Sequence, residues 1–449
     1  MAEALVKSST FLCYREATFG VAPDLEDLVD HAIEVSGVPT FGDTYEQIER
    51  DVTRKAFSSY APIRGIESTS ASFPVELHGS GANATAPESL ELFRSAFGYC
   101  IGPVGETITD ATLGTTVAAT PAYTKSDSGT YEDPQMYEHK FDVTSSTGFQ
   151  VGYPCRVTDS TGATLRLVGF ILSITTNTII VLSSEPVLAG VIATDLFDCG
   201  YLFTLRKKDL EQVAELPSLT NQYYRGDIAR ETYVGNIVTQ LDIDFATGQL
   251  VLPSFTMEGT SVSYDGNSGA VGKFISDLAA ADPSEAGTSI TYDSENADPI
   301  VCTLTDVFME SLEDTPAVFE ECISNLQFSL TNEIYKKQCI QTTGIGKIIR
   351  TARNVTGSLN TFYASESFGD DFKSNVSYNL RALFNYTTSM SAGVRQQVTT
   401  PGNVIAVAIP KLNMTEVSIS EDTGIFKYDN TFSAEPTGSG DNELMIAIL

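Results

Sequence analysis

The chain contains no tryptophan and only three histidines, His31, His78 and His139, all in its N-terminal third. A serine or cysteine nucleophile farther along would therefore have no histidine base, and no G-x-S-x-G sequence is present. Gly344–Lys347 lacks the spacing of a P-loop, and Asp265–Gly269 lacks the later glutamate of an EF-hand. His78, beside a glycine break, is either a site residue or the end of a strand.

Cysteine is also used sparingly: the seven residues are scattered, odd in number and never spaced as C-x-x-C. This pattern argues against a disulfide framework or a zinc site and predicts free buried thiols in a reducing cytosol. The first ten residues lack the apolar core of a signal peptide. No run approaches 18 apolar residues, so we expect no transmembrane helix and no membrane anchor.

Basic residues are scarce, since 27 Lys and Arg stand against 58 Asp and Glu, for a net charge of −31. The excess either serves solubility or repels another polyanion, and such a chain should not hold DNA by neutralising phosphates. Between Phe274 and Tyr335 there are thirteen acidic residues and no basic one, whereas Lys336–Arg353 carries five basic residues.

What the chain does have is a β-protein composition, with 42% hydrophobic residues, 34 glycines, 24 phenylalanines and 19 tyrosines. Strong helical periodicity is rare. We therefore predict a mainly β fold with few helices.

One stretch near the N-terminus predicts a long hairpin followed by a short helix. We expect a charged strand over Ile48–Lys55, a loop over Ala56–Gly65 and a second strand over Ser70–His78, where apolar and polar residues alternate. After a Gly-Ser-Gly break, helical spacing predicts a helix over Glu88–Phe97, closed by Gly98.

A similar order recurs later in the chain. A second hairpin surrounds Lys336 and Arg350, and Ser358 follows Arg350 by eight residues as Ser72 follows Arg64. We predict a second helix over 370–384 and closing strands over 404–409, 415–420 and 443–448. The order and spacing indicate two copies of one fold in tandem.

Between the two copies, the chain changes character. Short β-rich runs at 156–158, 164–174 and 178–182 are separated by tight turn sequences. They predict a small inserted β domain, or alternatively a β-rich arm that continues the first domain.

Several segments resemble the major tail proteins, or tail tube proteins, of long-tailed bacteriophages. The resemblance is carried by REATFG at Arg15–Gly20, FPVELHGSG at Phe73–Gly81, PESLELFRSAFG at Pro87–Gly98, FSLTNEI at Phe328–Ile334 and NVIAVAIPK at Asn403–Lys411. The order of these elements, rather than an invariant motif, is what is similar.

The resemblance implies two tandem tail-tube-type β-sandwich or barrel domains, each with one flanking helix. We expect a first tube domain at 1–140, the inserted small β domain at 141–205 and a second tube domain at 206–449. The implied function is structural: rings that stack into the hollow tail tube through which phage DNA is delivered, without enzymatic activity or cofactors.

The implied partners follow from that function. Two tube domains in each chain favour rings of three chains, with rings of six as the alternative. Tape-measure and tail-end proteins would join the tube, and double-stranded DNA would pass through without specific binding. The protein would be made and assembled in the host cytoplasm and then reside in the virion tail.

Two sets of residues are candidates for the surfaces that contact other subunits and that line the lumen. Basic and aromatic residues of the hairpins would contact neighbouring subunits or rings: Arg54, Lys55, Phe57, Tyr60, Arg64, Lys336, Lys337 and Arg350. Acidic residues on alternating strands would line the lumen: Glu76, Asp242, Asp244 and Glu416. These acidic faces could equally point outward to bulk water.

Two other functions remain open at this point. A secreted or surface adhesin is compatible with the β-rich insert and with five N-x-S/T sequons, although the signal peptide is missing. A glycosidase would need paired carboxylates, and Glu313 and Asp314 are the nearest approach. They are adjacent in sequence, so they are better placed to face solvent than to converge on one substrate.

Overall fold

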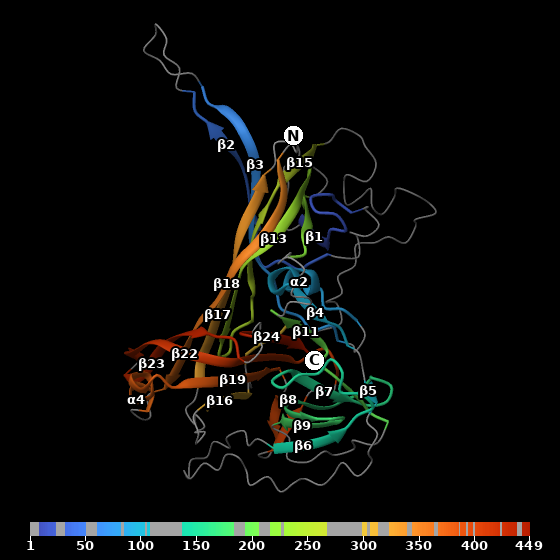
Figure 1. Cartoon of the computed structure of the whole chain (residues 1–449), viewed down its shortest axis with the longest axis vertical. Helices are drawn as coiled ribbons and strands as arrows, with labels where there is room; N and C mark the ends of the chain where they lie inside the picture. The colour runs from blue at the N-terminus through green and yellow to red at the C-terminus, as the bar shows by residue number, and fades with distance from the viewer. Residues whose placement is uncertain are drawn as a thin grey trace.

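The computed structural model describes residues 9–23, 32–50, 61–81, 85–103, 106–107, 137–183, 194–205, 216–225, 229–266, 299–302, 306–312, 323–338, 344–362, 367–385, 387–391, 394–397, 400–422, 424–437 and 442–449. Strands dominate this part of the chain, which confirms the mainly β prediction (Figure 1). Neither described helix is long and apolar enough to cross a membrane.

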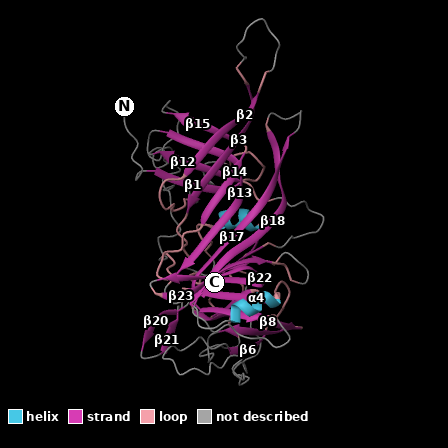
Figure 2. Ribbon diagram, turned by 90° about the vertical axis from the view of Figure 1, so that its left-hand side faces the viewer, coloured by secondary structure: helices cyan, strands magenta, loops and turns pink. Residues whose placement is uncertain are grey.

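Most described strands belong to one large antiparallel sheet. Its main path runs β2-β3-β14-β13-β17-β18-β23-β22-β24-β11-β4, with further strands attached at its sides. Figure 2 shows the long strands of this sheet from the side. In the described residues it contains β1 Ser9–Arg15, β2 Thr40–Ile48, β3 Ile63–Pro74, β4 Tyr99–Ile101, β11 Tyr201–Thr204, β12 Leu219–Arg225, β13 Ala229–Ala246, β14 Ser254–Gly259, β15 Ser261–Gly266, β16 Asp306–Ser311, β17 Ile323–Gln338, β18 Ile345–Phe362, β19 Ser377–Phe384, β22 Ile405–Asp422, β23 Ile425–Ala434 and β24 Met445–Ile448.

A second, smaller sheet is built from the middle of the chain, in the order β5-β10-β7-β8-β9-β6. Its strands are β5 Glu106–Thr107, β6 Tyr137–Asp142, β7 Pro154–Thr158, β8 Leu165–Thr175, β9 Thr178–Ser183 and β10 Leu196–Asp198. The strands predicted over 156–158, 164–174 and 178–182 match β7, β8 and β9 within two residues. A separate hairpin pairs β20 Thr387–Ser391 with β21 Val394–Gln397.

The smaller sheet packs on one end of the large sheet (Figure 1). Along β22, Ile405 and Val407 face the main core, while Ala406 and Ala408 face the core of the smaller sheet. This half of β22 is therefore buried on both faces, which explains its nearly continuous apolar sequence. The small alanine side chains let the two layers approach closely.

Two helices flank the sheets. Helix α2 Leu90–Phe97 packs Phe93 against Phe203 and Phe255, with ring centroids 5.2 and 5.4 Å apart. Gly98 ends the helix in the left-handed region at φ +91°, where its N–H donates to the carbonyl of Arg94. The helix begins two residues after the predicted start and ends at the predicted residue, which confirms the prediction. Both ends could be predicted because their signals are local in the sequence.

The second helix differs from its prediction over 370–384. Helix α4 covers only Ser367–Ser374, and the residues after it form β19. β19 lies between β16 and β22, and its side chains are buried or half-buried. Pairing on both sides therefore outweighs the local helical spacing.

The first hairpin also starts earlier than predicted. β2 ends at Ile48, where the charged strand over Ile48–Lys55 was expected to begin, and 51–60 lies outside the described residues. The two closing strands over 404–409 and 415–420 are one strand, β22, with an irregularity between Met414 and Glu416.

The pairing of strands repeats within the chain. Two sets of elements occur in the same order along the chain, and we call them the first and the second repeat. The first repeat is β1, β2, β3, α2, β12, β13, β14 and β15, and the second repeat is β16, β17, β18, α4, β19, β22, β23 and β24, each element corresponding to the one at the same place in the other list. In the first set β1 pairs with β12, β2 with β3, β3 with β14, and β13 with β12, β14 and β15. The second set has the corresponding pairs.

The register repeats as well. β13 and β22 each have 18 residues, and each changes partners midway along its length. The register shifts at Val238/Gln240 in β13 and at Met414/Glu416 in β22, which are equivalent steps of the two strands. Ser72 pairs with Thr256 as Ser358 pairs with Thr431. This is the correspondence of Ser72 with Ser358 that the sequence spacing indicates.

The two sets are joined within one sheet rather than separated. The second half of β13 pairs with β17 over seven residues, from Gln240 opposite Thr331 to Ala246 opposite Asn325. A single core cluster takes residues from both sets, including Phe73, Phe255 and Phe328.

Candidate assembly surfaces

The β2–β3 hairpin extends from one end of the molecule (Figure 1). Near its described end, Ile48 and Ile63 lie directly opposite each other and both are exposed. The guanidinium of Arg64 lies 5.0 Å from the ring centroid of Tyr45. Of the predicted contact residues, Arg54, Lys55, Phe57 and Tyr60 lie outside the described residues.

The second hairpin, β17–β18, presents a different set of groups. Lys337 is exposed and lies opposite Lys347, and Tyr335 is exposed beside it. Lys336 reaches across to the first repeat, where its Nζ lies 2.8 Å from Glu258 Oε2 and donates to Ser68 Oγ over 2.8 Å. Lys336 therefore braces the two hairpins within one chain.

Arg350, also a predicted contact residue, lies inside the chain and is only 9% exposed. It donates to the carbonyl of Phe97 over 3.4 Å and to Asn332 Oδ1 over 3.3 Å, and Asn332 donates to the carbonyl of Ala96. A cation at the last carbonyls of α2 complements the negative end of the helix dipole. Within the chain, Arg350 thus ties the second hairpin to the helix of the first repeat.

One face of the large sheet is polar across eight strands. Residues that are cross-strand partners share a face, so the register defines rows across the sheet. One row is Thr40, Ser72, Thr256, Gln240, Thr331 and Asn354. A second row is Asp244, Gln327, Ser358, Thr431 and Glu416. None of these side chains is buried, and neither row contains Lys or Arg.

Three of the four predicted lumen residues belong to this polar face. Asp244 and Glu416 lie in the second row and are exposed, and Asp242 lies one step along β13 from Asp244 on the same face. Both carboxylate oxygens of Asp242 accept hydrogen bonds from Gln240 Nε2, over 3.0 and 2.8 Å. Glu76 lies beyond the end of β3, where it meets Glu34 and His78 instead.

Several strands of the large sheet pair on one side only among the described residues, and two of these open edges, on β2 and on β22, correspond to strands that pair with each other where the two sets join. β2 pairs only with β3, and the half of β22 after Met414 pairs only with β23. The equivalent half of β13 is covered by β17, and there Ile243 is 1% exposed. Its counterpart on the open edge of β22, Ile419, is 57% exposed. In the described residues, this half of β22 is thus an open strand edge that exposes one large apolar side chain, Ile419.

These edges are absent from the sequence predictions, although a signal was present. β2 reads FGDTYE from Phe41 and β17 reads FSLTNE from Phe328, with Phe, Thr and Glu at matching positions. Comparison of these two strings would have identified β2 and β17 as equivalent strands.

Comparison with known proteins adds an independent finding. The chain matches a family model described as phage tail tube protein over residues 7–442, which is nearly its whole length. No curated protein matches it. Nothing in these comparisons favours a surface adhesin, and the matched family is structural rather than enzymatic.

Proposed function

Since this chain belongs to the phage tail tube protein family, we propose that three copies of it close into one ring of the tail tube. The family places the protein in the virion tail as a structural subunit that assembles with itself. The observation that supports three copies is the repeated strand pairing, because each chain supplies two equivalent units of one sheet.

The strand pairing that connects the two repeats within one chain indicates how one chain would pair with the next. Inside the chain, the second half of β13 pairs with β17. β22 corresponds to β13 and β2 corresponds to β17, so the open half of β22 would pair with β2 of the next chain. Such a head-to-tail contact closes a ring when the rotation between units is right.

The register of β13 with β17 also predicts the register of β22 with β2 of the next chain. Asp244 pairs with Gln327 and Ile243 with Phe328 inside the chain. The equivalent pairs between chains are Ser420 with Thr40 and Ile419 with Phe41. This contact would bury Ile419 and extend the first row to Ser420, whose cross-strand partner on β23 is Lys427.

Engineered cysteines test both the register and the copy number. Ser420→Cys combined with Thr40→Cys places the two Cβ atoms about 4.5–5.5 Å apart across the strands, close enough for a disulfide after small adjustments. Because each chain has one donor edge and one acceptor edge, oxidised rings should run as covalent trimers on a denaturing gel. The off-register pair Ser420→Cys with Thr44→Cys, displaced by about 13 Å along the strand, should not cross-link.

Rings of six chains, with the second half as decoration, are the alternative. A covalent hexamer, or a native ring mass of six chains, would reject the trimer. The position of β17, β18, β22 and β23 within the same sheet as the first unit supports three copies, because a decorating half would not need to continue the sheet.

The hairpins are proposed to carry contacts between stacked rings. β2–β3 extends beyond the body of the sheet, and exposed Ile48, Ile63, Tyr335 and Lys337 combine apolar and basic groups. The surrounding excess of acidic residues supplies complementary charge. Deletion of 56–63 should leave soluble, folded protein that no longer forms tubes, and normal tube growth after this deletion would contradict the assignment.

The polar face is proposed to line the lumen. DNA that slides through a tube must not be held by its wall, and each Lys or Arg on a phosphate would add favourable counterion release. The two rows of Ser, Thr, Asn, Gln, Asp and Glu offer hydrogen-bonding groups and negative charge but no basic group. The opposite face is apolar and fills the core, so it is not available to the channel.

Replacement of Asp242 and Asp244 by Lys tests whether the polar face lines the lumen. Both positions are on the sheet surface, so tubes should still form, while phage carrying the variant should eject DNA more slowly, and more so at low salt. Intact tubes with unchanged ejection would place these residues elsewhere. A matched control is Asp370→Lys on exposed α4, outside the polar rows.

The smaller sheet is proposed to be the inserted domain, on the outside of the tube. It packs on the first half of β22 and on β24, away from the polar rows of the second half. The tube would be assembled in the host cytoplasm, where tape-measure and tail-end proteins would bind to it. If so, these proteins should co-elute with the tube protein when tails are purified from infected cells.

A further inference from the structure

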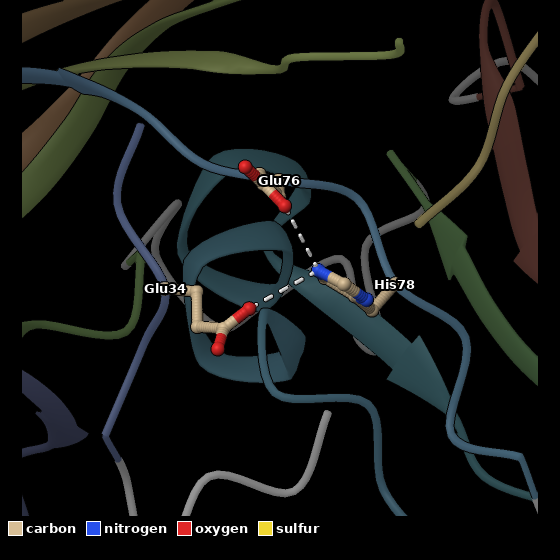
Figure 3. Close-up of side chains that lie close together, drawn as sticks. All are labelled: Glu34, Glu76 and His78. Carbon is tan, nitrogen blue, oxygen red and sulfur yellow. Dashed lines mark ion pairs between the residues drawn. The ribbon is translucent and has the colours of Figure 1, made fainter. Parts of the chain in front are cut away.

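Three side chains that are good metal ligands meet beyond the end of β3: Glu34, Glu76 and His78 (Figure 3). The imidazole of His78 points between the two carboxylates, and its Nε2 lies 3.4 Å from Glu34 Oε2 and 3.5 Å from Glu76 Oε2. The three ligand atoms all lie within 4.8 Å of one another. His78 is 6% exposed, whereas the side chains of Glu34 and Glu76 are 45% and 33% exposed.

The backbone holds these residues in place. Glu76 and His78 are two residues apart on an extended segment, so their side chains share one face. Glu34 comes from a neighbouring segment that is tied to it by a bridge between Val35 and Val75 and by a hydrogen bond from the Glu76 N–H to the Glu34 carbonyl, over 3.3 Å. The N–H of Glu34 also donates to a carboxylate oxygen of Glu88, before helix α2.

Two of the three separations between the ligand atoms are compatible with a metal ion held between them. A charged N–H···O⁻ hydrogen bond is about 2.7–2.9 Å long, shorter than either distance from Nε2. In a tetrahedral zinc site with metal–ligand bonds of about 2.0–2.1 Å, neighbouring ligand atoms lie about 3.3 Å apart. The two distances of 3.4 and 3.5 Å match the second spacing.

We propose that Glu34, Glu76 and His78 bind a divalent transition-metal ion, Zn²⁺ being the best fit to the ligand set and spacing. An imidazole nitrogen beside two carboxylates suits zinc, while calcium and magnesium sites are built from oxygen ligands alone. The buried imidazole supplies a fixed ligand at the back of the site, and the half-exposed carboxylates leave an approach from solvent. A water molecule would complete four-fold coordination.

Bound zinc would fasten two segments that are far apart in sequence. The residues around Glu34 precede the β2–β3 hairpin, and those around Glu76 and His78 follow it. The metal would therefore clamp the base of the hairpin, and because the site exists only in the folded chain, binding would stabilise the native state.

The test uses the full-length purified protein after removal of metal by a chelator. Isothermal titration with ZnCl₂ at a pH of about 7.5 should show one zinc ion per chain, and bound zinc should raise the midpoint of thermal unfolding. Glu34→Gln removes one ligand from a half-exposed position and should weaken zinc binding by at least about tenfold. His78→Gln should weaken it further.

The exposed residue Glu333 on β17 supplies the matched control. Glu333→Gln removes the same charge from a strand surface and should bind zinc as the unmodified protein does. If His78→Gln does not fold, Glu34→Gln decides the question alone. The proposal is overturned if the unmodified protein binds no zinc, or if Glu34→Gln binds it as tightly as the control, which would leave a histidine–carboxylate ion pair only. Tube formation, followed separately in the same preparations, reports on the proposed function.

Discussion

Ile419 offers the sharpest test of how chains join, because its environment in the ring can be worked out from its counterpart. Ile243 is 1% exposed where β17 covers it, and Ile419 is 57% exposed on the open edge. Pairing with β2 of the next chain should therefore bury about half of its side chain.

The size of the effect follows from this burial. Full burial of an isoleucine side chain stabilises by about 1.5–3 kcal/mol, so half burial contributes about 1 kcal/mol, or about fivefold in the affinity of one contact. Ile419→Ala should lower that affinity by about this factor. Ile419→Asp should have a larger effect, because the contact would also remove a carboxylate from water, at a cost of several kcal/mol.

The assay combines sedimentation velocity, negative-stain microscopy and circular dichroism. Ile419→Asp should be a folded monomer that forms no rings, and Ile419→Ala should form rings only at higher concentration. Val151→Asp is the matched control, since Val151 is 58% exposed in the loop before β7 and does not belong to the open edge of β22. Normal rings and tubes from Ile419→Asp would refute the proposed pairing of β22 with β2.

Three further predictions concern buried groups. Asp198→Ala leaves the guanidinium of Arg156 buried without the carboxylate 2.7 Å away, and should destabilise the protein by about 3–5 kcal/mol in chemical denaturation. Arg350→Met removes the hydrogen bonds to Phe97 and Asn332 and should cost about 1–3 kcal/mol; an unchanged denaturation midpoint would mean that the link to α2 is unimportant. Burial raises the pKa of the Cys100 thiol to about 11, so in native protein near pH 8 alkylation followed by peptide mapping should leave Cys100 unmodified. Because burial disfavours the thiolate in the folded state, the free energy of unfolding should fall as pH rises above the ordinary thiol pKa of 9.0, and this loss should be complete near pH 11.

Local sequence patterns were sufficient for several elements of this protein. The strands β7, β8 and β9 follow from short β-rich runs between turns, and the end of α2 follows from Gly98, because a left-handed residue is needed there. Asp242 and Asp244 were predicted to share the acidic face of an alternating strand, and in β13 they alternate with the buried side chains of Leu241, Ile243 and Phe245. In each case the cause lies within a few residues along the chain.

Partner choice between distant strands was decided only by the tertiary structure. The helical spacing after residue 370 gave way to strand β19, because β16 and β22 lie on either side of it. Arg350 resembled a surface contact in the sequence, yet its guanidinium lies at the end of α2. Glu34 and His78 are also far apart in the chain and meet only because two extended segments pair beyond β3. Composition and spacing determine which residues form strands and which face of a strand is polar, whereas long-range pairing determines which faces and edges are left for a second copy of the chain.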